Sequence, residues 1–162
     1  VFTLFHFTSS MNHLFASSAF AYEEDKVLAV QLIQRIEEER AKANKTGPLS
    51  LELVGFVDRP TTPLVSRIEN IGASFFGWDQ GNPTRALMFI KTLGYDLIDD
   101  LPVEQRGNYV LAGENMSTWP EAGSVQLVDD VIIIKFGPYS ETQIKNICSS
   151  TEIVSLPSGF CP

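Results

Sequence analysis

The sequence predicts an α/β or α+β fold, with one small mixed sheet of about four to five strands flanked by helices. Helical and strand patterns follow one another along 162 residues without an internal repeat or a linker. This length suits one domain with a sizeable core and is short for two. We therefore expect an apolar, helical segment over residues 1–22 and a single domain over residues 23–162.

The composition is that of a globular protein, because 44% of the residues are hydrophobic and 20% are charged. Acidic residues outnumber basic ones by 20 to 12, which gives a formal net charge of -8. Binding to a phosphate backbone requires a basic face, and no stretch of the chain supplies one. We therefore exclude nucleic acid as a partner.

Residues 1–22 are rich in Phe, Leu and Ala and carry no charge apart from what His6 and His13 take up. Asn12, the histidines and several serines interrupt any apolar run long enough to span a bilayer. Two interpretations remain open. The segment is either the extramembrane continuation of a membrane helix or an N-terminal helix that covers the core.

The first strong helix is predicted over residues 24–43, ending at the sequence Asn-Lys-Thr-Gly-Pro. A strand is predicted over residues 49–57, where leucines alternate with polar residues before the run becomes wholly apolar. The helix carries one apolar stripe at helical spacing, formed by Leu28, Ala29, Leu32, Ile33 and Ile36.

Two short helices follow, over residues 63–71 and 83–93. Each begins with a proline at the first helical position and ends at a glycine, Gly72 or Gly94. Beyond them, residues 108–113 are a candidate short strand.

Residues 124–136 read as two strands joined at Asp129-Asp130, and we interpret Asp99-Asp100 as turn residues as well. Ser140 is expected to cap a helix over residues 141–150, and residues 152–156 are a plausible last strand.

Cys148 and Cys161 are the two cysteines. Joined as a disulfide, they would close a short loop worth about 3 kcal/mol in the chain-entropy model, and the bond would indicate an oxidising compartment. The alternative is two unpaired buried thiols. A zinc site is not expected, because neither cysteine belongs to a CxxC pair and the histidines lie at the opposite end of the chain.

The motifs of self-contained catalysis are missing from the sequence. It contains neither G-x-G-x-x-G nor G-x-x-x-x-G-K-[ST], the two glycine-rich motifs that bind nucleotide phosphates. Ser74 lacks the second glycine of a nucleophile elbow. We therefore assign no catalytic residue, no metal site and no cofactor to this chain.

The best candidate site is the stretch from residue 72 to residue 85. The aromatic rings of Phe75, Phe76 and Trp78 lie there among glycines, directly before a helix N-terminus whose free N–H groups favour an anion. These rings and the N–H groups together suit a sugar ring or an anionic group. The alternative is that these rings belong to the core and that Arg85 pairs with Asp79. The candidate glycan- or anion-binding residues in this stretch are Trp78, Asp79, Gln80, Asn82 and Arg85.

Two stretches resemble one family: RIENIGASFFGWDQGNPTRALMFIKTLGY (67–95) and MSTWPEAGSVQLVDDVIIIKF (116–136). The chain from Asp25 to Phe136 resembles the C-terminal part of the lipid-linked-glucose O-antigen glucosyltransferases, the type II Gtr family. Trp119, in the second stretch, joins the candidate glycan-binding residues.

The resemblance implies a polytopic inner-membrane protein with this domain on the periplasmic side. Its reaction would be transfer of a glucosyl unit from an undecaprenyl-phosphate carrier to O-antigen. The implied partners are the membrane-embedded part of the same chain and a glycan or lipid-linked sugar. Catalytic residues are expected outside this chain, which would have an accessory or acceptor-binding role.

Two other functions remain open. One is a non-enzymatic periplasmic binding or assembly module of a different membrane protein, and the other is a free-standing soluble enzyme.

Overall fold

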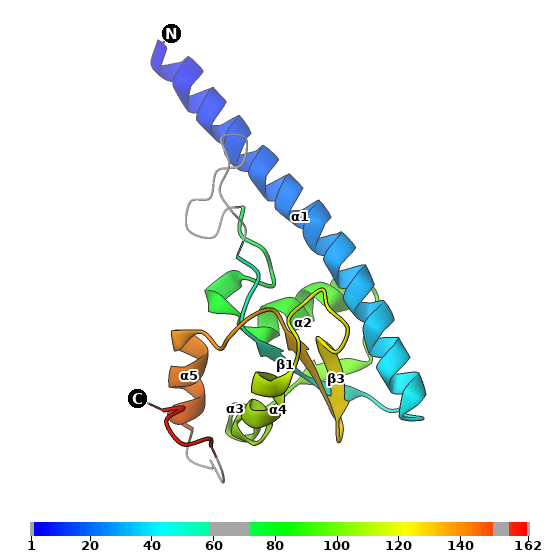
Figure 1. The fold of residues 1–162 in the computed structure, drawn as a ribbon. Helices are drawn as coiled ribbons and strands as arrows, with labels where there is room; N and C mark the ends of the chain where they lie inside the picture. The colour runs from blue at the N-terminus through cyan, green and yellow to red at the C-terminus, as the bar shows by residue number, and fades with distance from the viewer. Residues whose placement is uncertain (1, 59–71, 151–155, 162) are drawn as a thin grey trace.

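The computed structural model describes residues 2–58, 72–150 and 156–161. A four-stranded mixed sheet lies between helices on its two faces, in one small domain (Figure 1). The predicted fold class is therefore confirmed. The predicted helix over residues 63–71 and the predicted last strand over residues 152–156 fall mainly or wholly outside the described residues.

The sheet has the strand order β2-β1-β4-β3. The strand β1 (Leu49–Val54) pairs in parallel with β2 (Ile98–Asp100) on one side and with β4 (Val131–Lys135) on the other. The strand β3 (Val125–Val128) pairs antiparallel with β4, and the predicted turn at Asp129-Asp130 joins them. Asp129 adopts a φ of 56°, a left-handed conformation that aspartate tolerates in turns.

The helix α1 runs from Phe2 to Lys42 without interruption, so that the apolar segment and the first predicted helix are one element. Its C-terminal half packs against the sheet, and its N-terminal part projects away from the domain (Figure 1). The predicted stripe is confirmed, since Ala29, Leu32 and Ile36 are fully buried. Among the described residues no helix is long and apolar enough to cross a membrane.

The same face of the sheet is covered by α2 (Pro83–Thr92), whose apolar side meets the leucines of β1. Its predicted boundaries are confirmed: Asn82 caps the helix by accepting a hydrogen bond from the Thr84 N–H, and Pro83 takes the first position. Gly94 follows the end of the helix with a φ of 87°.

The other face carries α3 (Val103–Arg106), a 3₁₀ turn η2 (Gly107–Tyr109), α4 (Val110–Asn115) and α5 (Glu141–Cys148). The strand predicted over residues 108–113 is therefore wrong. Val110, Gly113 and Met116 are buried at three-residue spacing, which only a helix presents on one side.

The interpretation of Asp99-Asp100 as turn residues is also wrong, because both belong to β2. This strand lies at the edge of the sheet and pairs with β1 alone, so its carboxylates stay exposed. They bond to neighbouring side chains there: Asp99 accepts from Lys91, and Asp100 accepts from Thr84 and Arg106.

A buried amide joins the segments that follow β1 and β4. The Gln143 Nε2 group donates to the carbonyl oxygens of Leu53, Gly55 and Gly81, at 2.9, 3.2 and 3.1 Å. Its Oε1 atom accepts from the N–H groups of Gly55 and Ser140. Gly81 has to be glycine here, because a Cβ atom would collide with the Gly55 carbonyl oxygen. Gln143 thus fixes where the chain re-enters the fold before α2.

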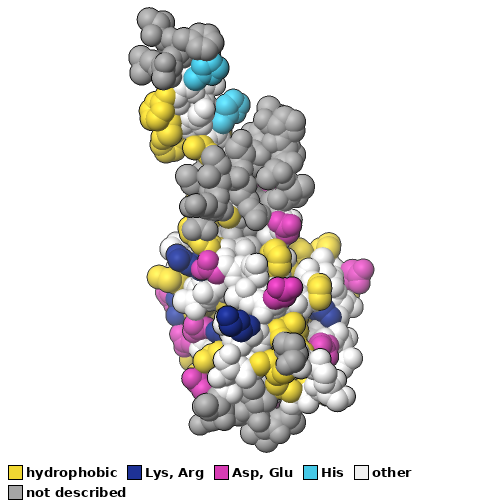
Figure 2. Space-filling model, turned by 90° about the vertical axis from the view of Figure 1, so that its left-hand side faces the viewer, with side chains coloured by type: hydrophobic (Ala, Val, Ile, Leu, Met, Phe, Trp, Pro, Cys, Tyr) yellow, Lys and Arg dark blue, Asp and Glu magenta, His cyan; other side chains and the backbone are white. Residues whose placement is uncertain are grey.

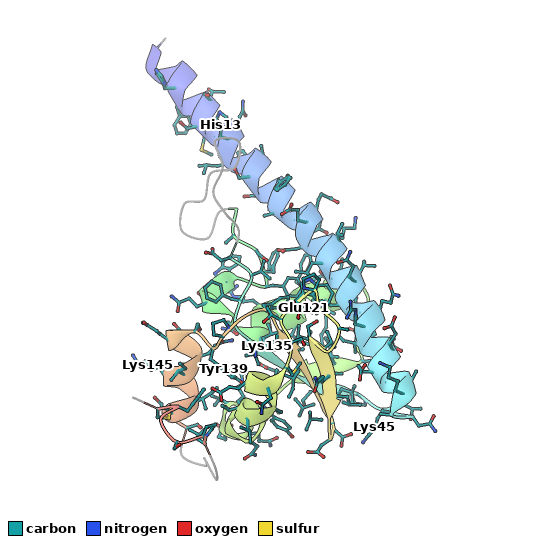
Figure 3. All side chains as sticks on the ribbon, in the orientation of Figure 1. His13, Lys45, Glu121, Lys135, Tyr139 and Lys145 are labelled. Carbon is teal, nitrogen blue, oxygen red and sulfur yellow. A yellow bond between two sulfur atoms is a disulfide. The ribbon has the colours of Figure 1, made fainter. Side chains whose placement is uncertain are left out.

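The predicted disulfide between Cys148 and Cys161 is present, with Cα atoms 5.9 Å apart. It holds the C-terminal residues against α5. Phe160 then packs edge-on against Tyr139, with ring centroids 5.3 Å apart. Tyr139 lies beside α5 (Figure 3).

Gln143→Leu should lower the free energy of unfolding by about 3 kcal/mol or more, because it leaves several buried backbone groups without partners. Urea denaturation measures this change. The matched control is Thr142→Val on the same helix, which loses one exposed hydrogen bond to the Gln80 side chain and should cost less than about 1 kcal/mol. Equal stability of the two variants would contradict the role of Gln143.

Candidate functional site

The start of the 72–85 stretch is part of the core. The carboxylate of Asp25, fully buried on α1, accepts from the Ser74 hydroxyl at 2.6 Å and from the Phe75 N–H at 2.7 Å. Phe76 is fully buried and packs edge-on against Phe89 and Phe136. The alternative that these aromatic rings fill the core therefore holds for Phe76.

The end of the stretch lies at the surface. Trp78, Asp79 and Gln80 form a 3₁₀ turn, η1, with Trp78 partly buried and the other two exposed. The Arg85 guanidinium lies 4.7 Å from the centre of the Trp78 ring. Its Nε atom is 3.8 Å from the Asp79 carboxylate, so the alternative pairing of Arg85 with Asp79 is also present. We name the group of Trp78, Asp79 and Arg85 the Trp78 rim.

Two of the predicted site residues serve the local structure. The Asn82 side chain caps α2. The Gln80 side-chain oxygen accepts a hydrogen bond from the Thr142 hydroxyl at 2.6 Å, and the Gln80 main-chain oxygen accepts one from the Ser140 hydroxyl. These contacts tie the Trp78 rim to α5.

Trp119 has a different set of neighbours. The Arg35 guanidinium of α1 lies 5.3 Å from the centre of the Trp119 ring and also donates to the carbonyl oxygens of Pro120 and Glu121. The structure thus brings Trp78, Asp79, Gln80, Asn82 and Arg85 together, whereas Trp119 lies against Arg35 of α1.

A polar cleft of about 370 Å³ adjoins the Trp78 rim, and Asp79 belongs to both. The chain leaves β1 toward α2 on one face of the sheet and leaves β4 toward α5 on the other. Clefts outside the carboxyl ends of strands at such a point commonly hold ligands in α/β sheets. The polar side chains that line it include Glu52, Asp79, Asn82, Thr84, Arg106 and Asn146.

Glu52, on the central strand β1, lines this cleft with a side chain that is 3% exposed. Its Oε2 atom lies 3.5 Å from the Arg106 Nε atom and forms no hydrogen bond. Burial raises the pKa of Glu52 from its ordinary 4.5 to about 8; the Arg106 charge opposes this rise and the Asp100 charge adds to it. Glu52 is therefore largely protonated at neutral pH.

Sequence reasoning missed Glu52. A glutamate between leucines fits the solvent-facing side of an alternating strand, and the alternation of residues 49–53 predicts such a strand. The available signal was the apolar run that continues on both faces to residue 57, because it is typical of a strand that is covered on both sides.

Tyr139 is a half-buried residue near Glu52 whose hydroxyl oxygen is buried. Among the described residues this hydroxyl has no hydrogen-bond partner, and its pKa is raised by burial and by the charge of Glu52. A Cβ atom at Gly113 would lie 2.8 Å from that hydroxyl, so the ring is enclosed by α4. Two buried oxygens without hydrogen bonds thus lie on the same side of the sheet.

The arrangement favours a neutral, hydroxylated ligand. The carboxylates of Asp79 and Asp100 offset the attraction of Arg85, Arg106 and the α2 N-terminus for an anion. Within residues 2–58, 72–150 and 156–161, no group of three His, Cys, Asp or Glu side chains is placed to hold a metal ion.

Comparisons with known proteins return no match to this chain among family models, curated proteins or solved structures.

The stability of the domain should fall as pH rises from about 4.5 to about 8. Over this range the folded state keeps the Glu52 proton that the unfolded chain releases. The stabilisation is complete below the lower value and is lost as pH rises through the upper one. The charged groups that act on Glu52 are Arg106 and Asp100, and the Tyr139 hydroxyl lies on the same side of the sheet.

Glu52→Gln removes this titration and should be more stable than the wild type at pH 8 by at least about 2 kcal/mol. At pH 4.5 the two proteins should differ little. Thermal unfolding across the pH range measures the difference. Glu104→Gln, an exposed acid on α3, is the control and should follow the wild type. Parallel pH curves for Glu52→Gln and the wild type would show that Glu52 titrates normally.

Truncating the aromatic residues should separate core from surface. Phe76→Ala should cost about 3 to 5 kcal/mol of unfolding free energy, because the ring is fully buried. Trp78→Ala should cost about 1 kcal/mol, the range of a partly exposed contact. Urea denaturation of both variants tests this order, and a larger loss for Trp78→Ala would make the rim part of the core.

Proposed function

We propose that this chain is the periplasmic C-terminal domain of a polytopic membrane glycosyltransferase. The enzyme moves a glucosyl unit from an undecaprenyl-phosphate carrier to O-antigen or a surface polysaccharide, and this domain binds the acceptor glycan. The proposal starts from the resemblance of residues 67–95 and 116–136 to that family. The structural observation that carries it is the position of the Trp78 rim beside the polar cleft.

The Trp78 rim has the chemistry of a glycan platform. An indole ring offers a large apolar face against which the C–H side of a pyranose can pack. Asp79 beside it accepts hydrogen bonds from hydroxyl groups, and Arg85 donates them. Both of these side chains are about half exposed, at 51% and 48%, so an incoming sugar reaches them without rearrangement of the core.

The helix α1 supports attachment to a membrane-embedded part of the same chain. Its projecting part carries no formal charge up to Tyr22, and Phe7 and Phe15 are exposed there by 64% and 67%. Both histidines lie on this projecting part, among uncharged side chains (Figure 2). The disulfide supports an oxidising compartment such as the periplasm.

A second candidate is a non-enzymatic periplasmic binding or assembly module of another membrane protein. The projecting apolar helix favours it as well, because such a helix serves any attachment. The two candidates differ in whether the parent protein transfers glucose.

The test is Trp78→Ala in the full-length parent protein, assayed for glucosyl transfer to O-antigen in membranes. The KM for the acceptor should rise about tenfold with kcat within twofold, since loss of a stacking face removes binding common to ground and transition states. Met88→Ala is the matched control, because it truncates an exposed residue on α2 outside the rim.

An unchanged KM would reject the rim as the acceptor site. A parent protein without transfer activity that still binds glycan through Trp78 would favour the second candidate.

A further inference from the structure

The floor of the cleft contains a buried acceptor without a donor. Glu52 Oε2 is inaccessible to solvent and, among the residues that the structure describes, forms no hydrogen bond and lies within ion-pair distance of Arg106 alone. A buried polar atom in this state is costly, and a ligand that donates a hydrogen bond to it recovers part of that cost. Glu52 is one of the residues that line the cleft, with its side chain 3% exposed.

The groups around Glu52 are donors and acceptors of the kind that hydroxyl groups use. The Arg106 guanidinium, 14% exposed, is held by the Leu101 carbonyl oxygen and the Asp100 carboxylate. Asn146 of α5 and Thr84 of α2 line the cleft as well. A fixed acceptor next to a fixed guanidinium matches two adjacent hydroxyls of a polyol, one donating to the carboxyl and one accepting from the arginine.

The walls and the charges restrict the ligand further. Val103 and Ile147 supply apolar surface, and a volume of about 370 Å³ is within the range of small-molecule pockets. The carboxylates of Asp79, which lines the cleft, and of Asp100, which pairs with Arg106, repel an anion. A neutral ring with hydroxyl groups and C–H faces satisfies these conditions.

We propose that the Glu52 cleft is a binding site for one neutral monosaccharide unit, with adjacent hydroxyls on Glu52 and Arg106. This inference rests on the proposed function and extends it. The cleft selects one sugar unit of the acceptor glycan, and a neighbouring unit of that glycan lies across the Trp78 rim. Glu52 and Arg106 are then the residues that determine specificity, and a uronic acid or phosphorylated sugar is rejected.

The experiment is a titration of the ¹⁵N-labelled 162-residue chain with methyl α-D-glucopyranoside, followed by two-dimensional NMR at pH 6.5. Saturable shifts are expected for Glu52, Arg106 and Asn146, with a millimolar dissociation constant. The matched probes are methyl β-D-glucuronide and inorganic phosphate, which should bind at least tenfold more weakly. Absence of saturable shifts in the cleft, or tighter binding of either anion, would overturn the inference.

Three variants assign the binding to the cleft. Glu52→Leu, similar in size but without hydrogen bonds, should abolish saturable binding, whereas Glu52→Gln should keep it within about threefold because the amide still donates and accepts. Asn146→Phe places a ring in the cleft from an exposed position on α5 and should also abolish binding. It decides the question if Glu52→Leu does not fold. Wild-type affinity in Asn146→Phe would contradict the proposal.

Failure here is distinguishable from failure of the proposed function. Met88→Ala should leave the affinity for the single glucoside within twofold, because Met88 lies outside both the cleft and the Trp78 rim. Glucoside binding that requires Glu52 would stand even if the full-length parent shows no dependence on Trp78. Dependence of the parent on Trp78 without glucoside binding in the cleft would reject the cleft alone.

Discussion

The buried amide of Gln143 is the constraint on which the surroundings of the cleft depend. It bonds to the end of β1, to Gly81 just before the N-cap of α2, and to the N-cap residue of α5. Asn82, the N-cap of α2, follows Gly81, so the position of Gly81 sets where the Trp78 rim and the α2 side of the cleft lie. An amide can do this because it has two N–H donors, shared here among three carbonyl oxygens, and an oxygen that accepts twice. A carboxylate or a hydrocarbon of the same size would leave main-chain groups unpaired.

Glu52 presents the opposite energetic situation, a group that the fold keeps at a cost. Its carboxyl is held between α3 and the sheet with a single arginine nearby, and burial keeps the proton on it at neutral pH. A leucine at this position would suit a strand covered on both faces. Natural proteins keep a polar group at a position suited to an apolar one mainly at functional sites, where the lost stability serves function.

The sequence allowed most of the fold to be predicted, because its helices carry local signals. The apolar stripe of α1, the proline at the start of α2 and the Ser140 cap of α5 each act within a few residues. The errors arose where tertiary contacts decide. Residues 108–113 have strand-like composition but follow a helical turn against the sheet, and Asp99-Asp100 form an edge strand only because β1 lies beside them.

The candidate site was predictable to the same extent. The chain order placed Trp78 beside Arg85, whereas Glu52 and Arg106, 54 positions apart, meet only through the parallel pairing of the sheet.

The unbroken helix α1 has a consequence for orientation. Its 41 residues extend over about 60 Å, and no glycine or proline interrupts them. Each residue of an α-helix turns the chain by about 100°. The rotation about the helix axis between Phe7 and Phe15 at one end and the sheet at the other is therefore fixed. Inserting one residue between the projecting and packed parts would swing the cleft about a quarter turn, while every contact within the domain stayed the same. The helix therefore sets the direction that the cleft faces as well as its distance from the end of the helix.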